Sequence, residues 1–243
     1  YHIGEIRNTS PRAARKNVQL FERIIAHAAD SGIRRLVFVS SLTVAGIPSR
    51  FPADEGTEPS VVLDDHYTRY KKRCEELLLQ SGAGVEFAVI RPGIVYGPGS
   101  RYLKGLLGAV KTLGPLGFPF VGAGNNVAPL IHVRDLAQSI YRAGLQKNAA
   151  GQVFNLTDGL DHSWRAFFSA IAGSLGKRFR FLAIPPFLLR GPARVFDLFG
   201  TLLGISMSVD AYVRYATSDL LFDISKAKRV LEWTPAYDLA RGV

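Results

Sequence analysis

Hydrophobic and polar positions in the first hundred residues follow helical and strand spacing in turn. Residues 10–32 place apolar side chains on one helical face, behind a serine and a proline that suit a helix start. Residues 36–40 form a short apolar run rich in β-branched side chains, as in a strand covered on both faces. A second helix is predicted over residues 67–81 and a second buried strand over 85–90. This order predicts an α/β fold with a doubly wound parallel sheet.

The pattern loosens in the rest of the chain. Helices are expected near residues 103–111, over 134–145 and from about 163 to 175, with one more strand at 153–156. Residues 181–209 are strongly apolar but are interrupted by prolines and arginines. This segment is expected to belong to a smaller unit beside the sheet.

The composition is that of an ordinary globular protein with an excess of positive charge. The 243 residues include 30 Lys plus Arg against 20 Asp plus Glu, a formal net charge of +10. That charge suits anionic partners, and a solvated basic surface also explains it. The basic residues are scattered and form no recognisable nucleic-acid module, so nucleic acid is not an expected partner.

Cysteine and histidine content limits the chemistry. The lone Cys74 excludes an internal disulfide, and the five histidines are too far apart in sequence for a metal site, so no metal is expected. No uncharged apolar run approaches the roughly 18 residues of a membrane span, and the first twenty residues lack a signal-peptide pattern. A reducing, cytoplasmic location is therefore expected.

Tyr67 and Lys71 are the first candidates for chemistry. They are four residues apart on an expected helix and share one face. A free phenol titrates near pH ~10, and a nearby cation favours its phenolate form, which suits acid/base work near neutral pH. Ser40 and Ser41 come at the carboxyl end of the first expected strand, where open α/β sheets bind ligands. Each pair also has a plain structural explanation, but their joint presence favours a site.

These residues lie within motifs that resemble the extended short-chain dehydrogenases/reductases, the NAD-dependent epimerase/dehydratase family. The motifs occur in the family's order and cover nearly the whole chain. They are residues 36–46 (LVFVSSLTVAG), similar to the catalytic-serine strand; 67–71 (YTRYK), similar to the active-site helix; 91–98 (RPGIVYGP), similar to the turn against the nicotinamide; 131–137 (IHVRDLA) and 153–158 (VFNLTD), similar to later structural motifs; and 223–235 (DISKAKRVLEWTP), similar to the C-terminal signature.

The resemblance assigns catalytic roles to three residues. It makes Tyr67 the general acid/base, with Lys71 binding the nicotinamide ribose hydroxyls and keeping the phenol acidic. It makes Ser41 the residue that orients the reacting carbonyl or hydroxyl, because Ser41 holds the family's place before the Leu-Thr-Val stretch. The implied cofactor is NAD or NADP.

Four further residues are implied to lie at the cofactor. Pro92 and Ile94 would present backbone groups to the nicotinamide carboxamide. Ser40 would lie beside the cofactor at the strand end, and Asn17 matches the family's helix asparagine near the active site. Asn17 also fits a polar residue near a helix start. The resemblance further implies a homodimer formed through the first two helices.

The start of the chain departs from the family. The family opens with a strand, a Gly-x-x-Gly-x-x-Gly turn and a helix whose N-terminus carries the pyrophosphate, and this sequence shows none of these. The first residue is Tyr1, the only methionine is Met207, and residues 1–4 resemble the end of the family's fourth strand. An N-terminally truncated member that binds dinucleotide poorly is therefore expected.

The domain assignment follows from the same resemblance. Residues 1–100 are expected to form the C-terminal part of the dinucleotide-binding domain, with the catalytic residues. Residues 101–243 are expected to be mainly the substrate-binding domain, and 128–158 to return to the Rossmann-like core. The expected architecture is an incomplete doubly wound sheet with a smaller C-terminal substrate domain.

Arginines that would grip a nucleotide sugar are missing from their usual places. Relatives that act on such sugars carry an arginine shortly before the His-Val-x-Asp motif and another before the C-terminal motif. This chain has residues 125–130 (NNVAPL) and Ala216 there, with Arg214 close to the second place. Residues 179–209 are rich in Phe and Leu, which suits an apolar pocket or the core of a small domain. With the loop at 122–126, they resemble the hydroxysteroid dehydrogenase and dihydroflavonol reductase branch.

The leading hypothesis is an NAD(P)-dependent oxidoreductase. It would move hydride between nicotinamide and a secondary alcohol or ketone of a hydrophobic small molecule, such as a sterol-, terpenoid- or flavonoid-like substrate. One alternative is a nucleotide-sugar epimerase or dehydratase. Another is a non-catalytic protein that senses dinucleotide or binds a partner protein. A peripheral membrane contact through residues 186–203 is a further alternative for the apolar segment.

Overall fold

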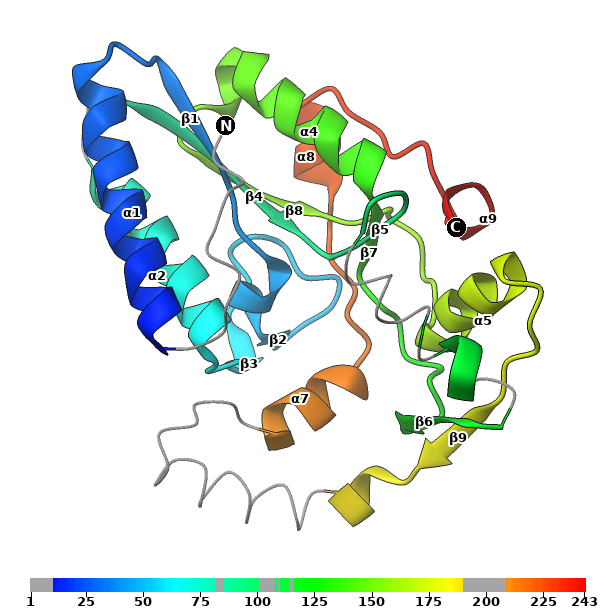
Figure 1. Ribbon diagram of the computed structural model, residues 1–243. Coiled ribbons are helices and arrows are strands. Elements are labelled where there is room, and N and C mark those ends of the chain that lie inside the picture. Colours follow the sequence, from blue (N-terminus) through cyan, green and yellow to red (C-terminus); the bar gives the residue numbers. More distant parts are fainter. Residues whose placement is uncertain (1–10, 82–84, 101–107, 109, 114–115, 190–208) are drawn as a thin grey trace.

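A three-stranded parallel sheet forms the centre of the larger lobe (Figure 1). The computed structural model of the chain describes residues 11–81, 85–100, 108, 110–113, 116–189 and 209–243. The strands are β1 (Arg35–Val39), β4 (Glu86–Pro92) and β8 (Gln152–Leu156), in the order β1-β4-β8, and each pairs in parallel with its neighbour. The predicted α/β class with a parallel sheet is confirmed.

Successive residues of a strand point to opposite faces of the sheet, and here both sets are apolar. Helices therefore cover both faces of this sheet. Leu36 and Phe38 pack on one face, and Val37 between them packs on the other. An ion pair between Arg91 of β4 and Glu75 fastens one covering helix, with Nη2 and Oε2 2.6 Å apart. The helices are α1 (Pro11–Asp30) and α2 (His66–Gln80) on the first face, and α4 (Val133–Leu145) and α8 (Ser225–Val230) on the second (Figure 1).

Aromatic side chains hold the smaller lobe together. Phe168 lies 5.0 Å from Phe118 and 5.7 Å from Phe181, measured between ring centroids. Trp164 and Phe167 belong to the same buried cluster. The elements that carry these rings are α5 (Trp164–Ser174) and the two parallel strands β6 (Phe118–Val121) and β9 (Phe181–Ile184), with α9 (Leu239–Gly242) packed against α5.

Two short parallel strands join the lobes. They are β5 (Ile94–Tyr96) and β7 (Leu130–His132). Their side chains alternate, so Ile131 packs into the core of the larger lobe and Leu130 into the aromatic cluster of the smaller one. The carboxyl ends of β4 and β8 are thereby fixed relative to the smaller lobe.

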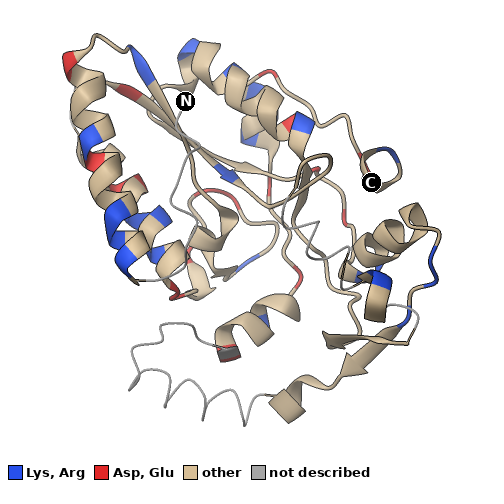
Figure 2. Cartoon of the chain, viewed as in Figure 1, with Lys and Arg blue, Asp and Glu red and all other residues tan. Residues whose placement is uncertain are grey.

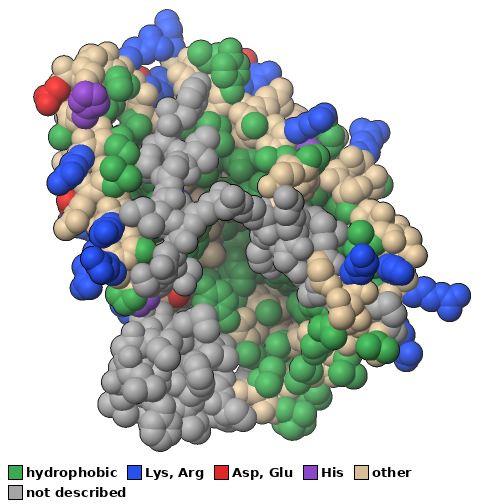
Figure 3. Space-filling view, viewed as in Figure 1, with side chains coloured by type: hydrophobic (Ala, Val, Ile, Leu, Met, Phe, Trp, Pro, Cys, Tyr) green, Lys and Arg blue, Asp and Glu red, His purple; other side chains and the backbone are tan. Residues whose placement is uncertain are grey.

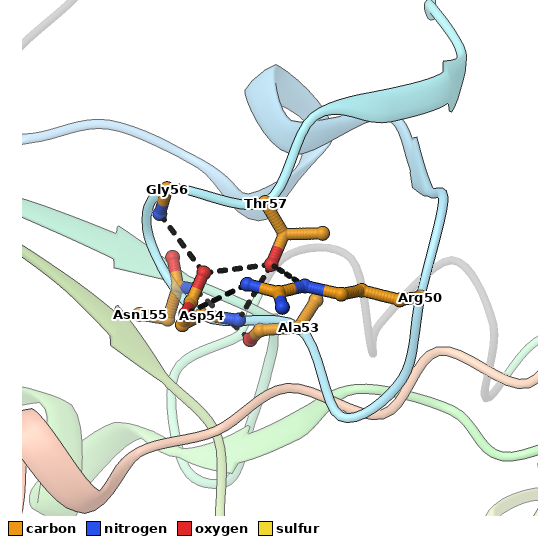
Figure 4. A network of polar contacts seen from close by, with 6 residues as sticks. All are labelled: Arg50, Ala53, Asp54, Gly56, Thr57 and Asn155. Atoms are coloured by element: carbon orange, nitrogen blue, oxygen red, sulfur yellow. Dashed lines mark hydrogen bonds and ion pairs between the residues drawn. The ribbon is translucent and has the colours of Figure 1, made fainter.

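A fourth hydrophobic cluster follows the carboxyl end of β1. It is built from η1 (Leu42–Ala45), β2 (Ile47–Pro48), β3 (Pro59–Val61) and α7 (Val209–Ala216). The loop between β2 and β3 is closed by polar contacts (Figure 4). Asp54 accepts hydrogen bonds from Gly56 N at 3.1 Å and from Thr57 Oγ1 at 2.7 Å. The next residue, Glu55, accepts from Asn155 N of β8 at 2.8 Å. The loop therefore covers the outer edge of β8.

Most long elements agree with the sequence prediction. The predicted helix near residues 103–111 lies mostly outside the described residues, as do residues 1–4 and most of 181–209. Strands β5, β6, β7 and β9 are not predicted by the sequence pattern, because runs of three or four residues show no measurable period. Within the described ranges, every helix is too short or too polar to traverse a bilayer.

Asp158, just after β8, is a buried carboxylic acid. Its Oδ1 accepts a hydrogen bond from Leu160 N at 3.0 Å, and His162 Nε2 lies 3.9 Å from its Oδ2. Burial raises the pKa of Asp158 to about 7, and the nearby carboxylates of Asp135 and Asp238 act in the same direction. The hydrogen bond from Leu160 acts against this shift. The folded state therefore holds a proton here that the unfolded chain would lose near pH 3.8.

This raised pKa predicts a pH-dependent stability. The contribution of protonated Asp158 is fully present below pH 3.8 and is lost as the pH rises through about 7. Between about pH 5 and about pH 8 the free energy of unfolding should fall by on the order of 2 kcal/mol more in the native chain than in Asp158→Asn. Denaturant titrations at the two pH values measure this. Asp161→Asn, at an exposed neighbour, is the matched control and should behave as the native chain. Identical pH dependence in Asp158→Asn would contradict the assignment.

Candidate active site

Ser41 lies at the junction between β1 and η1. It is the N-cap of η1, and its Oγ accepts hydrogen bonds from Thr43 N at 3.2 Å and from Thr43 Oγ1 at 3.0 Å. A hydroxyl has two lone pairs and one proton, so these contacts leave the Ser41 hydroxyl set to donate. The side chain is half-buried. A donor of this kind suits a carbonyl oxygen or a developing alkoxide.

Asp65 fixes the start of α2, the helix that carries Tyr67. Its Oδ1 accepts hydrogen bonds from Tyr67 N at 2.8 Å and from Thr68 N at 3.0 Å, as an N-cap aspartate does. Helix α2 also packs against η1, which Ser41 begins. The first turn of α2 therefore lies next to Ser41. We call Ser41, the first turn of α2 and the end of β1 the wall of the site.

Lys71 fastens α2 to the end of β1. Its side chain is 5% exposed, and its Nζ donates a hydrogen bond to Val39 O at 2.9 Å. The same Nζ lies 5.5 Å from the centre of the Tyr67 ring and 5.0 Å from that of Tyr70. A buried ammonium needs such partners because desolvation without them is costly. The structure therefore brings Tyr67 and Lys71 together as predicted, although their catalytic roles stay predictions.

Ser40 and Asn17 are both buried near this wall. Ser40 is the residue after β1, and its Oγ has no hydrogen-bond partner within the described part of the chain. Buried hydroxyl groups in proteins normally have a hydrogen-bond partner. A ligand at the end of β1 would supply one. Asn17 lies on the buried face of α1, one turn before Phe21, which packs against β1. The roles predicted for Ser40 and Asn17 are not tested by these positions.

Pro92 and Ile94 lie where β4 passes into β5. Pro92 is buried at the end of β4, opposite Leu156 of β8. The Ile94 N–H donates to Pro129 O at 2.6 Å. This amide is therefore used inside the protein, and any contact of Ile94 with a carboxamide would have to come from another of its groups.

Tyr212 of α7 is a site residue that sequence reasoning missed. Its hydroxyl donates a hydrogen bond to Asp65 Oδ2 at 2.7 Å, and Thr68 Oγ1 donates to the same oxygen at 2.7 Å. Burial, followed by the hydrogen bond to Asp65, raises the pKa of the Tyr212 phenol well above its usual value, so it stays a donor. Tyr212 is 147 residues from Asp65, and no local spacing signals a contact at that separation.

Cysteine and metal-ligating side chains are less suited to catalysis here. Cys74 is buried, and burial raises the pKa of its thiol to about 12, so it does not act as a thiolate nucleophile. Across the described ranges, no group of three His, Cys, Asp or Glu side chains is placed to hold a metal ion. The candidate catalytic residues are therefore Ser41, Tyr67 and Lys71.

Two named relatives show the range of proteins that this sequence resembles. The chain is 33% identical over 218 residues to a UDP-glucose 4-epimerase of Vibrio cholerae, covering 88% of this chain and 62% of that protein. It is 27% identical over 244 residues to a 3beta-hydroxysteroid-dehydrogenase/decarboxylase of Arabidopsis thaliana, covering 93% of this chain and 43% of that protein. The chain thus spans less than two thirds of the length of either relative.

Solved structures show the same fold. UDP-glucuronic acid 4-epimerase from Bacillus cereus, solved in complex with NAD, superposes with a TM-score of 0.74 at 18% identity, over 100% of this chain and 70% of that one. Residues 2–157, more than half of the chain, match the sequence model of the NAD dependent epimerase/dehydratase family. These findings confirm the resemblance seen in the motifs and the nicotinamide dinucleotide expected from it. The chain belongs to the NAD dependent epimerase/dehydratase family.

Proposed function

We propose that the protein moves hydride between a nicotinamide dinucleotide and a secondary alcohol or ketone of a hydrophobic substrate. The observation that carries this proposal is the position of Lys71, bound to Val39 O and 5.5 Å from the centre of the Tyr67 ring. This places a cation beside a phenol at the carboxyl end of a parallel strand, the usual ligand edge of such sheets. Ser41 adds a hydroxyl donor on the adjoining helix.

The residues divide the proton chemistry between them. Tyr67 accepts the hydroxyl proton of an alcohol or returns it to a ketone oxygen. The Lys71 charge stabilises the tyrosinate, and Ser41 donates a hydrogen bond to the reacting oxygen, which holds the substrate carbon in place. When bound, the dinucleotide supplies the ring that accepts or returns the hydride. Because Lys71 is fastened to Val39, its charge is positioned before substrate arrives.

The residues around the strand end suit a dinucleotide ribose. Ser40 Oγ is buried and has no hydrogen-bond partner among the described residues. Lys71 Nζ lies at the neighbouring carbonyl of Val39. A hydroxyl and an ammonium are groups that bind sugar hydroxyls, so the proposal puts the ribose at this end of β1.

The preference for a hydrophobic substrate rests on the ion pair that Arg214 forms within the protein. Its Nε donates to Asp210 Oδ2 at 2.8 Å within α7, so its charge is already paired. Residues 125–130 contain no arginine that could grip a pyrophosphate. The Arabidopsis relative named for a hydroxysteroid agrees with this preference. The Vibrio relative named for UDP-glucose keeps a nucleotide-sugar epimerase as the second candidate.

A homodimer through α1 and α2 is part of the proposal. The two helices pack side by side, and a groove of about 580 Å³ runs between them. Its lining mixes the apolar Val18 and Tyr70 with the charged Arg15, Glu22 and Arg69. A second copy could fill this groove with its own helices. A cytoplasmic location likewise stays a prediction.

Net cofactor reduction separates the two candidate functions. The full protein, with any residues that precede Tyr1, should form NADH or NADPH with a 3β-hydroxysteroid and should form none with UDP-glucose. Tyr67→Phe should lower this rate by at least about 100-fold, because the proton acceptor is lost. Its dinucleotide affinity should be unchanged.

Tyr141→Phe, which removes an exposed hydroxyl from α4, is the matched control and should keep the native rate. Interconversion of UDP-glucose and UDP-galactose without net reduction would favour the epimerase. Dinucleotide binding without turnover of any substrate would favour a non-catalytic role.

The contact between Tyr212 and Asp65 predicts a positioning effect on turnover. Tyr212→Phe removes one of the two side-chain donors to Asp65 Oδ2 and loosens the first turn of α2. We expect kcat to fall roughly three- to tenfold with unchanged KM for the dinucleotide, and stability to fall by about 1 kcal/mol. Tyr215→Phe on the same helix is the control. Lost stability with native kcat in Tyr212→Phe would show that the contact is only structural.

A further inference from the structure

The small sheet of β6 and β9 has an apolar outer face. Its inner side chains pack against α5, as the 5.7 Å separation of the Phe120 ring of β6 from the Phe168 ring of α5 shows. Side chains alternate along a strand, so Leu182 and Ile184 point away from that core. Leu182 is 59% exposed. A sheet face in water normally carries polar residues, which this face lacks.

The apolar surface continues beyond both strands. Leu116, in the turn before β6, is 82% exposed, and Phe187, in the helical turn after β9, is 72% exposed. Leu116 adjoins this face because its neighbour Gly117 lies against the Leu182 side chain. Phe187 extends the apolar surface at the other end, since it follows Ile184 by three residues. We define the docking face as Leu116, Pro119, Leu182, Ile184, Phe187 and Leu188.

Positive charge borders this face. Lys177, Arg178 and Arg180 are exposed just before β9, and none forms an ion pair within the described part of the chain. Residues 87–134 and 162–196 contain no Asp or Glu. Figure 2 accordingly shows basic residues on α5 and on the connection from α5 to β9, and no acidic residue on α5, β6 or β9. Figure 3 shows hydrophobic side chains along the lower right edge, over β6 and β9, with Lys and Arg beside them.

We propose that the docking face binds the surface of an anionic lipid bilayer. Its exposed leucines and Phe187 would enter the boundary between headgroups and acyl chains, while Lys177, Arg178 and Arg180 contact lipid phosphates. Each cation near such a surface strengthens binding roughly fivefold. A second copy of the chain fits less well, because two faces with the same basic border would repel each other.

This inference goes beyond the proposed function and does not depend on it. A protein held at a bilayer by this face would take a hydrophobic substrate from the membrane in which that substrate dissolves. Vesicle binding can be measured without any turnover, so a failure of the proposed reaction and a failure of this inference give different results.

Vesicle flotation tests the proposal directly. The full chain should float with vesicles that contain phosphatidylglycerol and stay behind with pure phosphatidylcholine, and added salt should release it. Leu182→Ser with Phe187→Ser should lower the bound fraction at least about tenfold. Arg178→Glu with Arg180→Glu should do the same. Circular dichroism confirms that the variants fold.

The matched control variants carry comparable substitutions at positions outside the docking face. Leu79→Ser with Leu145→Ser changes two leucines that are 62% and 54% exposed on α2 and α4. Arg23→Glu with Arg229→Glu gives the same change in net charge on α1 and α8. Both control pairs should bind vesicles within about twofold of the native chain.

Three outcomes would overturn the proposal. They are equal binding to neutral and anionic vesicles, equal loss of binding in the control pairs, and absence of binding to either vesicle. A self-association seen by light scattering, lost in Leu182→Ser with Phe187→Ser and unaccompanied by vesicle binding, would assign the face to a second copy instead.

Discussion

The hydrogen bond from Lys71 to the carbonyl oxygen of Val39 is the contact on which the site depends. It joins the helix that carries Tyr67 to the carboxyl end of strand β1, across 32 residues of chain. Lys71 is 5% exposed, and a backbone carbonyl oxygen and ring faces surround its Nζ in place of water. The same constraint sets the distance between the cation and the phenol. The acid/base role that we propose for Tyr67 rests on that arrangement.

Asp65 and Tyr212 together hold the start of α2 in place. Asp65 holds the first turn of α2 through Tyr67 N and Thr68 N, and Tyr212 holds Asp65 from α7. Helix α7 also packs into the cluster that contains Leu42 of η1. One helix therefore contacts the elements that present both the serine hydroxyl and the phenol. Residues far along the chain thereby help to position the candidate site residues.

Local patterns in the sequence predict the elements that build the large sheet. Helices α1, α2, α4 and α5 are long enough to show a helical period, and the apolar runs of β1, β4 and β8 are long enough to read as buried strands. The sequence predicts that Tyr67 and Lys71 lie close together, because residues four apart on a helix share one face. Tyr212 and Glu55 could not be found, since their partners Asp65 and Asn155 lie 147 and 100 residues away. The raised pKa of Asp158 also depends on burial, which spacing does not encode.

The pH dependence of turnover in Lys71→Met tests the central claim most directly. If the ammonium stabilises the tyrosinate, the variant of the full protein should lose at least about 100-fold in kcat near neutral pH and regain part of it as the pH approaches about 10. Circular dichroism should show that the variant is folded. A folded Lys71→Met protein with the native kcat and the native pH profile would contradict the account.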